Sequence, residues 1–174
     1  MKDNFEASLK MILHHEGGYV DHPQDPGGRT NLGVTQAVYE DWVDRPVTED
    51  EMRSLTVANV TPIYKRRYWD RMKGDDPLMA SGVDFCTFDL CVNGGTGRGA
   101  KMLQKVLGVT QDGGIGPQTL AALSKRDPVD VIENYAAQRE AFYRRLKTFD
   151  TFGRGWLRRN EETKLSALRM SEEA

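Results

Sequence analysis

The sequence predicts a mainly α-helical fold that contains one small irregular or β-hairpin segment near residues 19–34. Apolar residues recur at helical spacing along most of the chain, and residue types that start or stop helices bracket these stretches. Residues 19–34 are instead crowded with Pro, Gly, Asp and Asn, which favour turns and short strands. A chain of 174 residues, of which 29% are charged, suits a single compact domain.

The first half of the chain carries four helix signals. Apolar residues at positions 5, 9, 12 and 13 predict a first helix that should end at the Gly-Gly pair 17–18. A second helix should begin near Thr35, whose hydroxyl can cap it. Residues 48–51 have the spacing of a capping box, and Thr61-Pro62 looks like a cap followed by the first helical residue.

The second half of the chain is predicted to be helical as well. Over residues 83–92 the apolar side chains surround the helix axis, which is typical of a buried central helix. The following helix should end at Gly108, and Asp127-Pro128 should open a long one. The only two cysteines of the chain, five positions apart in the central helix, would lie about 140° apart, so we expect them to be reduced and unpaired.

Composition excludes several classes of protein. The net charge of −2 is unlike the basic balance of nucleic-acid-binding proteins, so no nucleic-acid partner is expected. No apolar run approaches the roughly 20 residues that span a bilayer, so we expect no membrane insertion. Residues 1–5 lack the apolar core of a signal peptide, which leads us to expect synthesis in the cytoplasm.

Charge is unevenly distributed along the chain. Residues 1–55 hold 11 acidic and 5 basic side chains, whereas residues 139–169 hold 9 basic and 4 acidic ones. The basic stretch is either a solvated face of the last helices or an electrostatic handle for an anionic surface, such as a wall rich in phosphate or carboxylate.

Glu16 is the most informative residue of the first predicted helix. At about 100° per residue it returns to within about 20° of Phe5, so it lies on the apolar stripe. Burial there and the partial negative charge of the last helical turn both favour a protonated carboxyl, which a general acid requires. The alternative is an ion pair between Glu16 and Arg29 or another base at a helix end.

A second carboxylate and several polar groups follow Glu16 closely. Asp25 lies in a tight Asp-Pro-Gly-Gly turn that can fold it back toward Glu16, although it can also be a simple Asx-turn residue. Two facing carboxyl groups, one protonated and one ionised, are what glycoside hydrolysis needs. Thr30 and Asn31 supply polar groups beside Gly33, whose small size leaves room for a ligand.

Metal and phosphate sites are the alternatives to a pair of carboxyl groups. On a helix His14 points about 160° away from Glu16, and the His-Glu-x-x-His pattern of zinc peptidases is missing, so we interpret the histidines as surface residues. The glycines of residues 94–99 lack the Gly-Lys-Ser/Thr ending of a phosphate loop. No metal or organic cofactor is expected.

Three motifs, HEGGY at residues 15–19, DPGG at 25–28 and TNLGVT at 30–35, resemble the signature of glycoside hydrolase family 108. This family contains the N-acetylmuramidases of phage endolysins and of bacterial proteins once called secretion activators. The resemblance continues through residues 63–94 and reaches the Gly-Trp…Arg pattern of residues 155–159, so it covers nearly the whole chain.

The resemblance implies a lysozyme-like helical fold with Glu16 as the catalytic acid at the end of the first helix. The spacing of Glu16, Asp25 and Thr30 is similar to the Glu/Asp/Thr trio of phage-type lysozymes, which implies that Asp25 and Thr30 are its catalytic partners. Asp21-His22 departs from the Asn-Asp pair that is frequent in the family, so neither residue is given a chemical role.

Residues 103–123 resemble the core of small helical peptidoglycan-binding modules. In this pattern Asp112-Gly113 makes a turn, Gly116 and Pro117 start a helix, and Thr119 can cap or bond nearby backbone. The resemblance implies a lysozyme-like catalytic region, residues 1–92, and a peptidoglycan-binding-like helical region, residues 93–174, packed as one compact unit. The alternative is that the second pattern is only a helix–turn–helix scaffold.

The expected function is hydrolysis of the β-1,4 bond between N-acetylmuramic acid and N-acetylglucosamine in peptidoglycan. Stacking or amide-type hydrogen bonds to the sugars are expected from Tyr19, Asn31, Tyr68, Trp69 and Asn93. The expected partners are glycan strands, with a holin pore or export system that brings a monomeric protein to the wall or periplasm. The alternatives are a lytic transglycosylase and a non-catalytic wall-binding or secretion-assisting protein.

Overall fold

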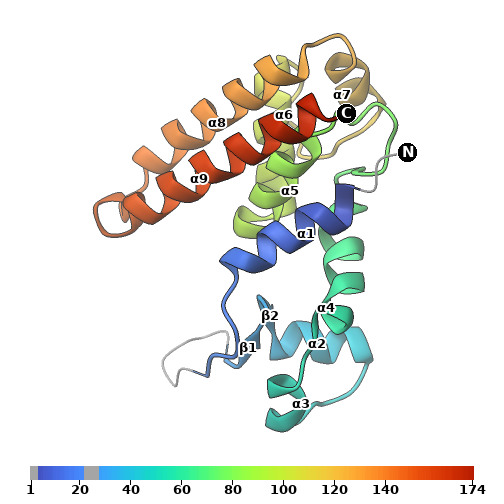
Figure 1. Cartoon of the computed structure of the whole chain (residues 1–174), viewed down its shortest axis with the longest axis vertical. Coiled ribbons are helices and arrows are strands. Elements are labelled where there is room, and N and C mark those ends of the chain that lie inside the picture. Colours follow the sequence, from blue (N-terminus) through green and yellow to red (C-terminus); the bar gives the residue numbers. More distant parts are fainter. Residues whose placement is uncertain (1–3, 22–27) are drawn as a thin grey trace. The chain divides into compact units, whose positions relative to one another are not determined.

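The computed structural model describes residues 4–21 and 28–174, and it is mainly α-helical as predicted (Figure 1). No helix of these residues is both long and apolar enough to cross a bilayer. In chain order the elements are α1 (Asn4–His15), β1 (Thr30–Asn31), β2 (Val34–Thr35), α2 (Gln36–Val43), α3 (Glu49–Arg53), α4 (Val57–Tyr64), the π-helix η1 (Lys65–Trp69), α5 (Val83–Gly94), α6 (Thr96–Leu107), α7 (Pro117–Leu123), α8 (Pro128–Arg144) and α9 (Phe149–Glu172).

The chain divides into two compact units. The N-terminal unit is Glu6–Arg67, and the C-terminal unit contains Tyr68–Ala174 together with the start of α1 up to Phe5. Compactness therefore divides the chain near residue 67, whereas the predicted catalytic and wall-binding regions, 1–92 and 93–174, divide it within α5.

The hairpin predicted near residues 19–34 is present in the N-terminal unit. Strands β1 and β2 pair antiparallel, and Val20 bridges to Thr30 on the other side of β1. The turn between the strands consists of Leu32 and Gly33, with φ of 50° and 75°. Positive φ at both central residues is typical of the tight two-residue turns that match strand twist, and Gly33 adopts it without strain.

Capping residues begin three helices of the N-terminal unit. The hydroxyl of Thr35 accepts a hydrogen bond from the Val38 N–H, and Thr48 forms the predicted capping box. The predicted start at Thr61-Pro62 is wrong, because α4 begins after Thr56, which forms a capping box of its own with Asn59. Pro62 therefore lies inside α4, which gives way to η1 two residues after it.

Helix α5 forms the core of the C-terminal unit. All nine residues from Val83 to Cys91 are buried, and α6, α8 and α9 pack around them, which confirms the predicted central helix. Helix α6 approaches α5 at Gly99, where a Cβ atom would lie 3.1 Å from the Cys91 nitrogen. Cys86 and Cys91 are both free and buried, and burial raises the pKa of the Cys91 thiol to about 12.

A buried charge cluster joins three helices of this unit. Asp89 on α5 pairs with Arg139 on α8 at 2.7 Å and with Arg159 on α9 at 2.9 Å. Burial alone would raise the pKa of the Asp89 carboxyl, but Arg139 and then Arg159 hold the pKa below its ordinary value. The Arg139 Nε donates to the hydroxyl of Tyr143, so the cluster also holds an aromatic side chain in place.

Candidate functional site

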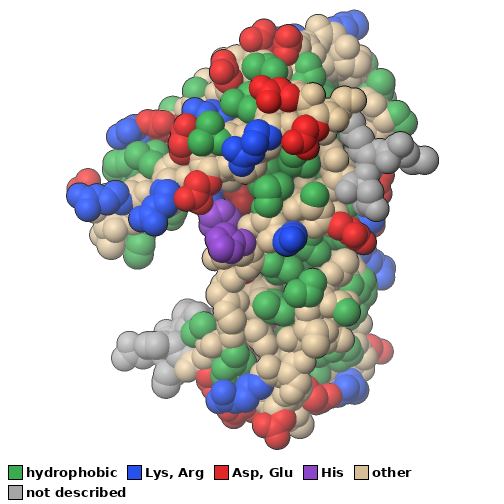
Figure 2. All heavy atoms as spheres, viewed as in Figure 1, with side chains coloured by type: hydrophobic (Ala, Val, Ile, Leu, Met, Phe, Trp, Pro, Cys, Tyr) green, Lys and Arg blue, Asp and Glu red, His purple; other side chains and the backbone are tan. Residues whose placement is uncertain are grey.

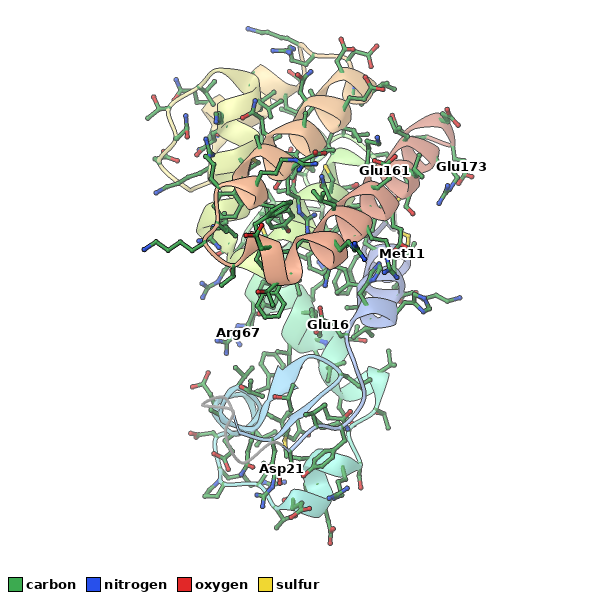
Figure 3. The ribbon with its side chains drawn as sticks, turned by 90° about the vertical axis from the view of Figure 1, so that its left-hand side faces the viewer. Met11, Glu16, Asp21, Arg67, Glu161 and Glu173 are labelled. Carbon is green, nitrogen blue, oxygen red and sulfur yellow. The ribbon has the colours of Figure 1, made fainter. Side chains whose placement is uncertain are left out.

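Glu16 lies directly after α1, as predicted. Its backbone N–H donates to the Ile12 carbonyl at 3.1 Å, so the residue continues the helical turn, and its side chain is half-buried. Figure 3 shows Glu16 at this end of the helix, where the chain turns away toward Asp21.

The tip of the hairpin packs against the Glu16 side chain. A Cβ atom on Gly33 would lie 3.0 Å from the Glu16 Cγ and 3.2 Å from its Oε2, and it would overlap the hydroxyl of Tyr64. That hydroxyl donates to the Leu32 carbonyl at 2.9 Å, and the Tyr64 ring is buried. The space predicted for a ligand at Gly33 is thus filled by the catalytic candidate itself and by Tyr64.

A network of partly exposed charges surrounds Tyr19. Arg29 pairs with Asp21 and with Glu49 at 3.2 Å each. The guanidinium of Arg53 lies 4.1 Å from the centre of the Tyr19 ring and covers one face of it. Burial and then the Glu49 carboxylate raise the pKa of Tyr19.

The other predicted residues of the N-terminal unit have different surroundings. Asn31 is buried, and its side-chain amide donates to the carbonyls of Met52 at 2.8 Å and Arg53 at 3.3 Å. These bonds tie the hairpin to α3, which corrects the expectation that Asn31 contacts a sugar. Thr30 is half-buried in β1, and Asp25 lies outside the described residues.

The two described histidines near Glu16 are surface residues. His14 and His15 are both exposed, and their ring centres lie 5.8 Å apart. In Figure 2 they form one patch at the end of α1. Over residues 4–21 and 28–174, no three His, Cys, Asp or Glu side chains are grouped so that they could hold a metal ion.

Three of the residues predicted to contact sugars, Tyr68, Trp69 and Asn93, lie in the C-terminal unit, and they differ in solvent exposure. Trp69 is 1% exposed, its Nε1 donates to Asp75 at 2.7 Å, and its ring packs against Phe5 and Phe88. Trp69 is therefore a core residue, which corrects its assignment as a stacking platform. Asn93 is exposed at the end of α5, where its amide donates to the Tyr143 hydroxyl at 3.2 Å. The third, Tyr68, is half-buried in η1.

Asn93 lines a cavity of about 170 Å³ in the C-terminal unit. The ring of Trp156 stacks on Tyr143 with centres 5.3 Å apart, which gives the cavity an aromatic wall. Neither Tyr143 nor Phe142 was predicted here, although the aromatic residues interleaved with arginines over residues 139–159 are a usable signal. The lining residues are Leu90, Asn93, Gly94, Arg98, Phe142, Tyr143, Leu146 and Trp156.

The polar groups of the residue 103–123 pattern hold a loop together. Gln104 is buried, and its Nε2 donates to the Asp112 carboxylate at 2.7 Å and to the Gly114 carbonyl at 2.9 Å. The Thr119 hydroxyl oxygen also accepts from this nitrogen, at 3.2 Å. The Gln104 Oε1 accepts from the Gly113 N–H at 3.0 Å. Since the amide is satisfied within the fold, Gln104 holds the loop between α6 and α7 in place.

Comparison with known proteins places the sequence of this chain in two known families. The family described as Glycosyl hydrolase 108 matches residues 9–95, and the family described as "Predicted Peptidoglycan domain" matches residues 98–161. The solved structure of Brucella abortus SagA is 42% identical, covers 98% of this chain and 97% of its own, and has a TM-score of 0.85. The chain belongs to the glycosyl hydrolase 108 family.

This glycosyl hydrolase 108 chain is thus a glycoside hydrolase with a peptidoglycan-type domain, as the resemblance implied. The hydrolase match contains Glu16 and the hairpin, and the peptidoglycan match contains Arg98 and Trp156 of the 170 Å³ cavity. No curated protein matches the chain.

Proposed function

We propose that this glycosyl hydrolase 108 protein cleaves the β-1,4 bond between N-acetylmuramic acid and N-acetylglucosamine, with Glu16 as the general acid. The contact of the Glu16 carboxyl with Gly33 carries the proposal. It holds a half-buried carboxyl beside a tight two-residue turn, within the part of the chain that matches the hydrolase family. A carboxyl held this way delivers its proton from one place, which lowers the entropic cost of the transition state.

In the proposed reaction the Glu16 carboxyl gives its proton to the glycosidic oxygen while the bond from that oxygen to the muramic acid carbon breaks. The positive charge that develops at this carbon is stabilised by a second carboxylate, or is met by a water that the carboxylate activates. We propose Asp25 for this role, with Thr30 positioning the water. The water supplies the hydroxyl of the new reducing end. Its proton returns to Glu16 when the second carboxylate only stabilises the charge. When that carboxylate activates the water it takes the proton, and exchange of one proton with solvent then restores both groups.

The test replaces Glu16 by Gln, which keeps the shape of the side chain and removes the titrating proton. We expect E16Q to lose at least about a hundredfold in the release of reducing ends from purified peptidoglycan, since general acids contribute about 10²–10⁴. E6Q makes the same change at an exposed position of α1 and should retain wild-type activity.

Mass spectrometry of the released fragments separates the alternatives. Reducing N-acetylmuramic acid ends support hydrolysis at the proposed bond, whereas 1,6-anhydro ends identify a lytic transglycosylase. If the wild-type protein binds peptidoglycan but does not release fragments from it, the non-catalytic wall-binding alternative holds. If E16Q releases fragments as fast as E6Q does, Glu16 is not the acid.

A further inference from the structure

A second, larger cavity lies beside the aromatic one in the C-terminal unit. Its volume is about 640 Å³, within the usual range of ligand sites. Four basic side chains from α6 and the end of α8 line it, and no acidic residue of the described chain does. These four, which we call the basic groove, are Arg98, Lys101, Lys105 and Arg145.

The charges of the basic groove are not neutralised by ion pairs within the described residues, and all four side chains are exposed. Other bases of the same unit are paired: Arg144 with Glu140, and Lys164 with Glu161. Asp112 lies close enough to Lys101 to interact, but its Oδ1 is already bonded to Gln104 and Gly114. The basic groove is therefore suited to bind a negatively charged ligand.

Arg98 forms the boundary between the basic groove and the 170 Å³ cavity. Its guanidinium lies 4.9 Å from the centre of the Phe142 ring, and its Nη1 donates to the Gly94 carbonyl at 3.0 Å. All three residues line both cavities, so the two form one continuous surface. One end offers aromatic rings and the Asn93 amide, which suit a sugar. The other carries the four positive charges, beside the neutral amides of Gln111 and Gln138.

We propose that this surface binds one repeating unit of peptidoglycan, with a sugar in the aromatic cavity and the carboxylates of the stem peptide in the basic groove. The inference rests on the proposed function and adds the part of the wall that the second domain recognises. A phosphate polymer would account for the charges but not for the adjoining aromatic and amide walls. All four basic residues also lie within the match to the peptidoglycan domain.

The test measures binding of soluble fragments to the full chain in the E16Q background, so that no cleavage occurs. The probes are a disaccharide tetrapeptide, the same disaccharide without its peptide, and poly(glycerol phosphate). The variant K105Q/R145Q removes two charges of the groove, and K125Q/R126Q removes two from exposed positions of the same unit outside it.

We expect K105Q/R145Q to bind the tetrapeptide fragment at least tenfold more weakly, while K125Q/R126Q stays within twofold of the parent. The peptide-free disaccharide should bind weakly and equally to all three proteins. Thermal melting shows whether K105Q/R145Q is folded, and the single variants K105Q and R145Q replace it if it is not.

Unchanged binding of the tetrapeptide fragment by the charge-removed variants overturns the inference, as does equal affinity for the peptide-free disaccharide. Tighter binding of poly(glycerol phosphate) would assign the groove to wall phosphate instead. None of these outcomes touches the proposed hydrolysis, which depends on the activity difference between E16Q and E6Q.

Discussion

The two units of the chain hold their charged residues in opposite ways. In the N-terminal unit the side chains of Arg29 and Glu49 pair while 33% and 41% exposed, and water screens such pairs so that they add little to folding. In the C-terminal unit the Arg139–Asp89 pair is 1% and 0% exposed. Removing one partner of a buried pair strongly lowers the free energy of unfolding, because the other charge is left without a partner in the protein interior. An ion pair around Tyr19 can therefore be lost at little cost in stability, whereas loss of the buried pair below the aromatic cavity should destabilise the C-terminal unit strongly.

The largest expected effect comes from breaking the buried cluster. D89N leaves Arg139 and Arg159 without their common carboxylate, and we expect the free energy of unfolding to fall by about 3–5 kcal/mol. Urea unfolding at pH 7 measures the loss. E140Q is the control, because it removes the partner of Arg144 from an exposed pair. Equal losses in the two variants would contradict the distinction between buried and exposed pairs.

The same cluster predicts how stability depends on pH. The arginines hold the pKa of Asp89 below its ordinary value of about 3.9. The stabilisation is therefore complete above about pH 4 and is lost as the pH falls through the lower pKa of the folded state. The difference in unfolding free energy between wild type and D89N should shrink over this interval, as a series of urea melts from pH 6 to pH 2 would show. A constant difference would mean that the carboxylate charge is not what stabilises the unit.

Gly33 should give the next largest effect, this time in the N-terminal unit. In G33A the alanine would have to keep the positive φ of Gly33, and its methyl group would overlap the Tyr64 hydroxyl beside Glu16. We expect a loss of about 2–3 kcal/mol in stability and a loss of wall-lysing activity, since the Glu16 carboxyl must move. G28A is a matched control, because Gly28 also has a positive φ, of 64°, but open space around its Cβ position. It should cost about 1–2 kcal/mol and reduce activity less than G33A does, because Gly28 belongs to the predicted turn that carries Asp25 but does not contact Glu16.

If G33A and G28A lost activity to the same degree, backbone strain in the hairpin would explain the result. The contact between Gly33 and Glu16 would then have no role in the reaction.

Local signals predicted most of the helices and the hairpin. Thr35, Thr48, Gly108 and Asp127 each act on backbone groups within a few residues, so their effect is visible in the sequence. The start of α4 was mispredicted because Pro62 looked like a first helical residue, whereas the capping box at Thr56 sets the boundary.

The roles of side chains were harder to predict, because tertiary contacts decide them. Trp69 and Asn31 are residue types that bind sugars, yet packing against other elements makes them structural. The basic stretch at residues 139–169 divides between two roles. Arg139 and Arg159 pair with Asp89 in the interior of the unit, whereas Arg145 lines the basic groove. The basic groove combines residues of α6 with Arg145, which lie about 40 positions apart.

The smallest effect should come from the exposed network around Tyr19. E49Q removes a carboxylate that Arg29 and Arg53 share, although Arg29 keeps Asp21. We expect a smaller loss of stability than in G28A, and one that vanishes at high salt. Thermal melts at low and high ionic strength measure it. E49Q also removes the carboxylate that holds Arg53 over the Tyr19 ring. If that face of the ring contacts sugar, the rate of peptidoglycan hydrolysis should change measurably even though the free energy of unfolding changes little. A stability loss as large as that of D89N would erase the contrast between the two units, since it would make the exposed network as rigid as the buried one.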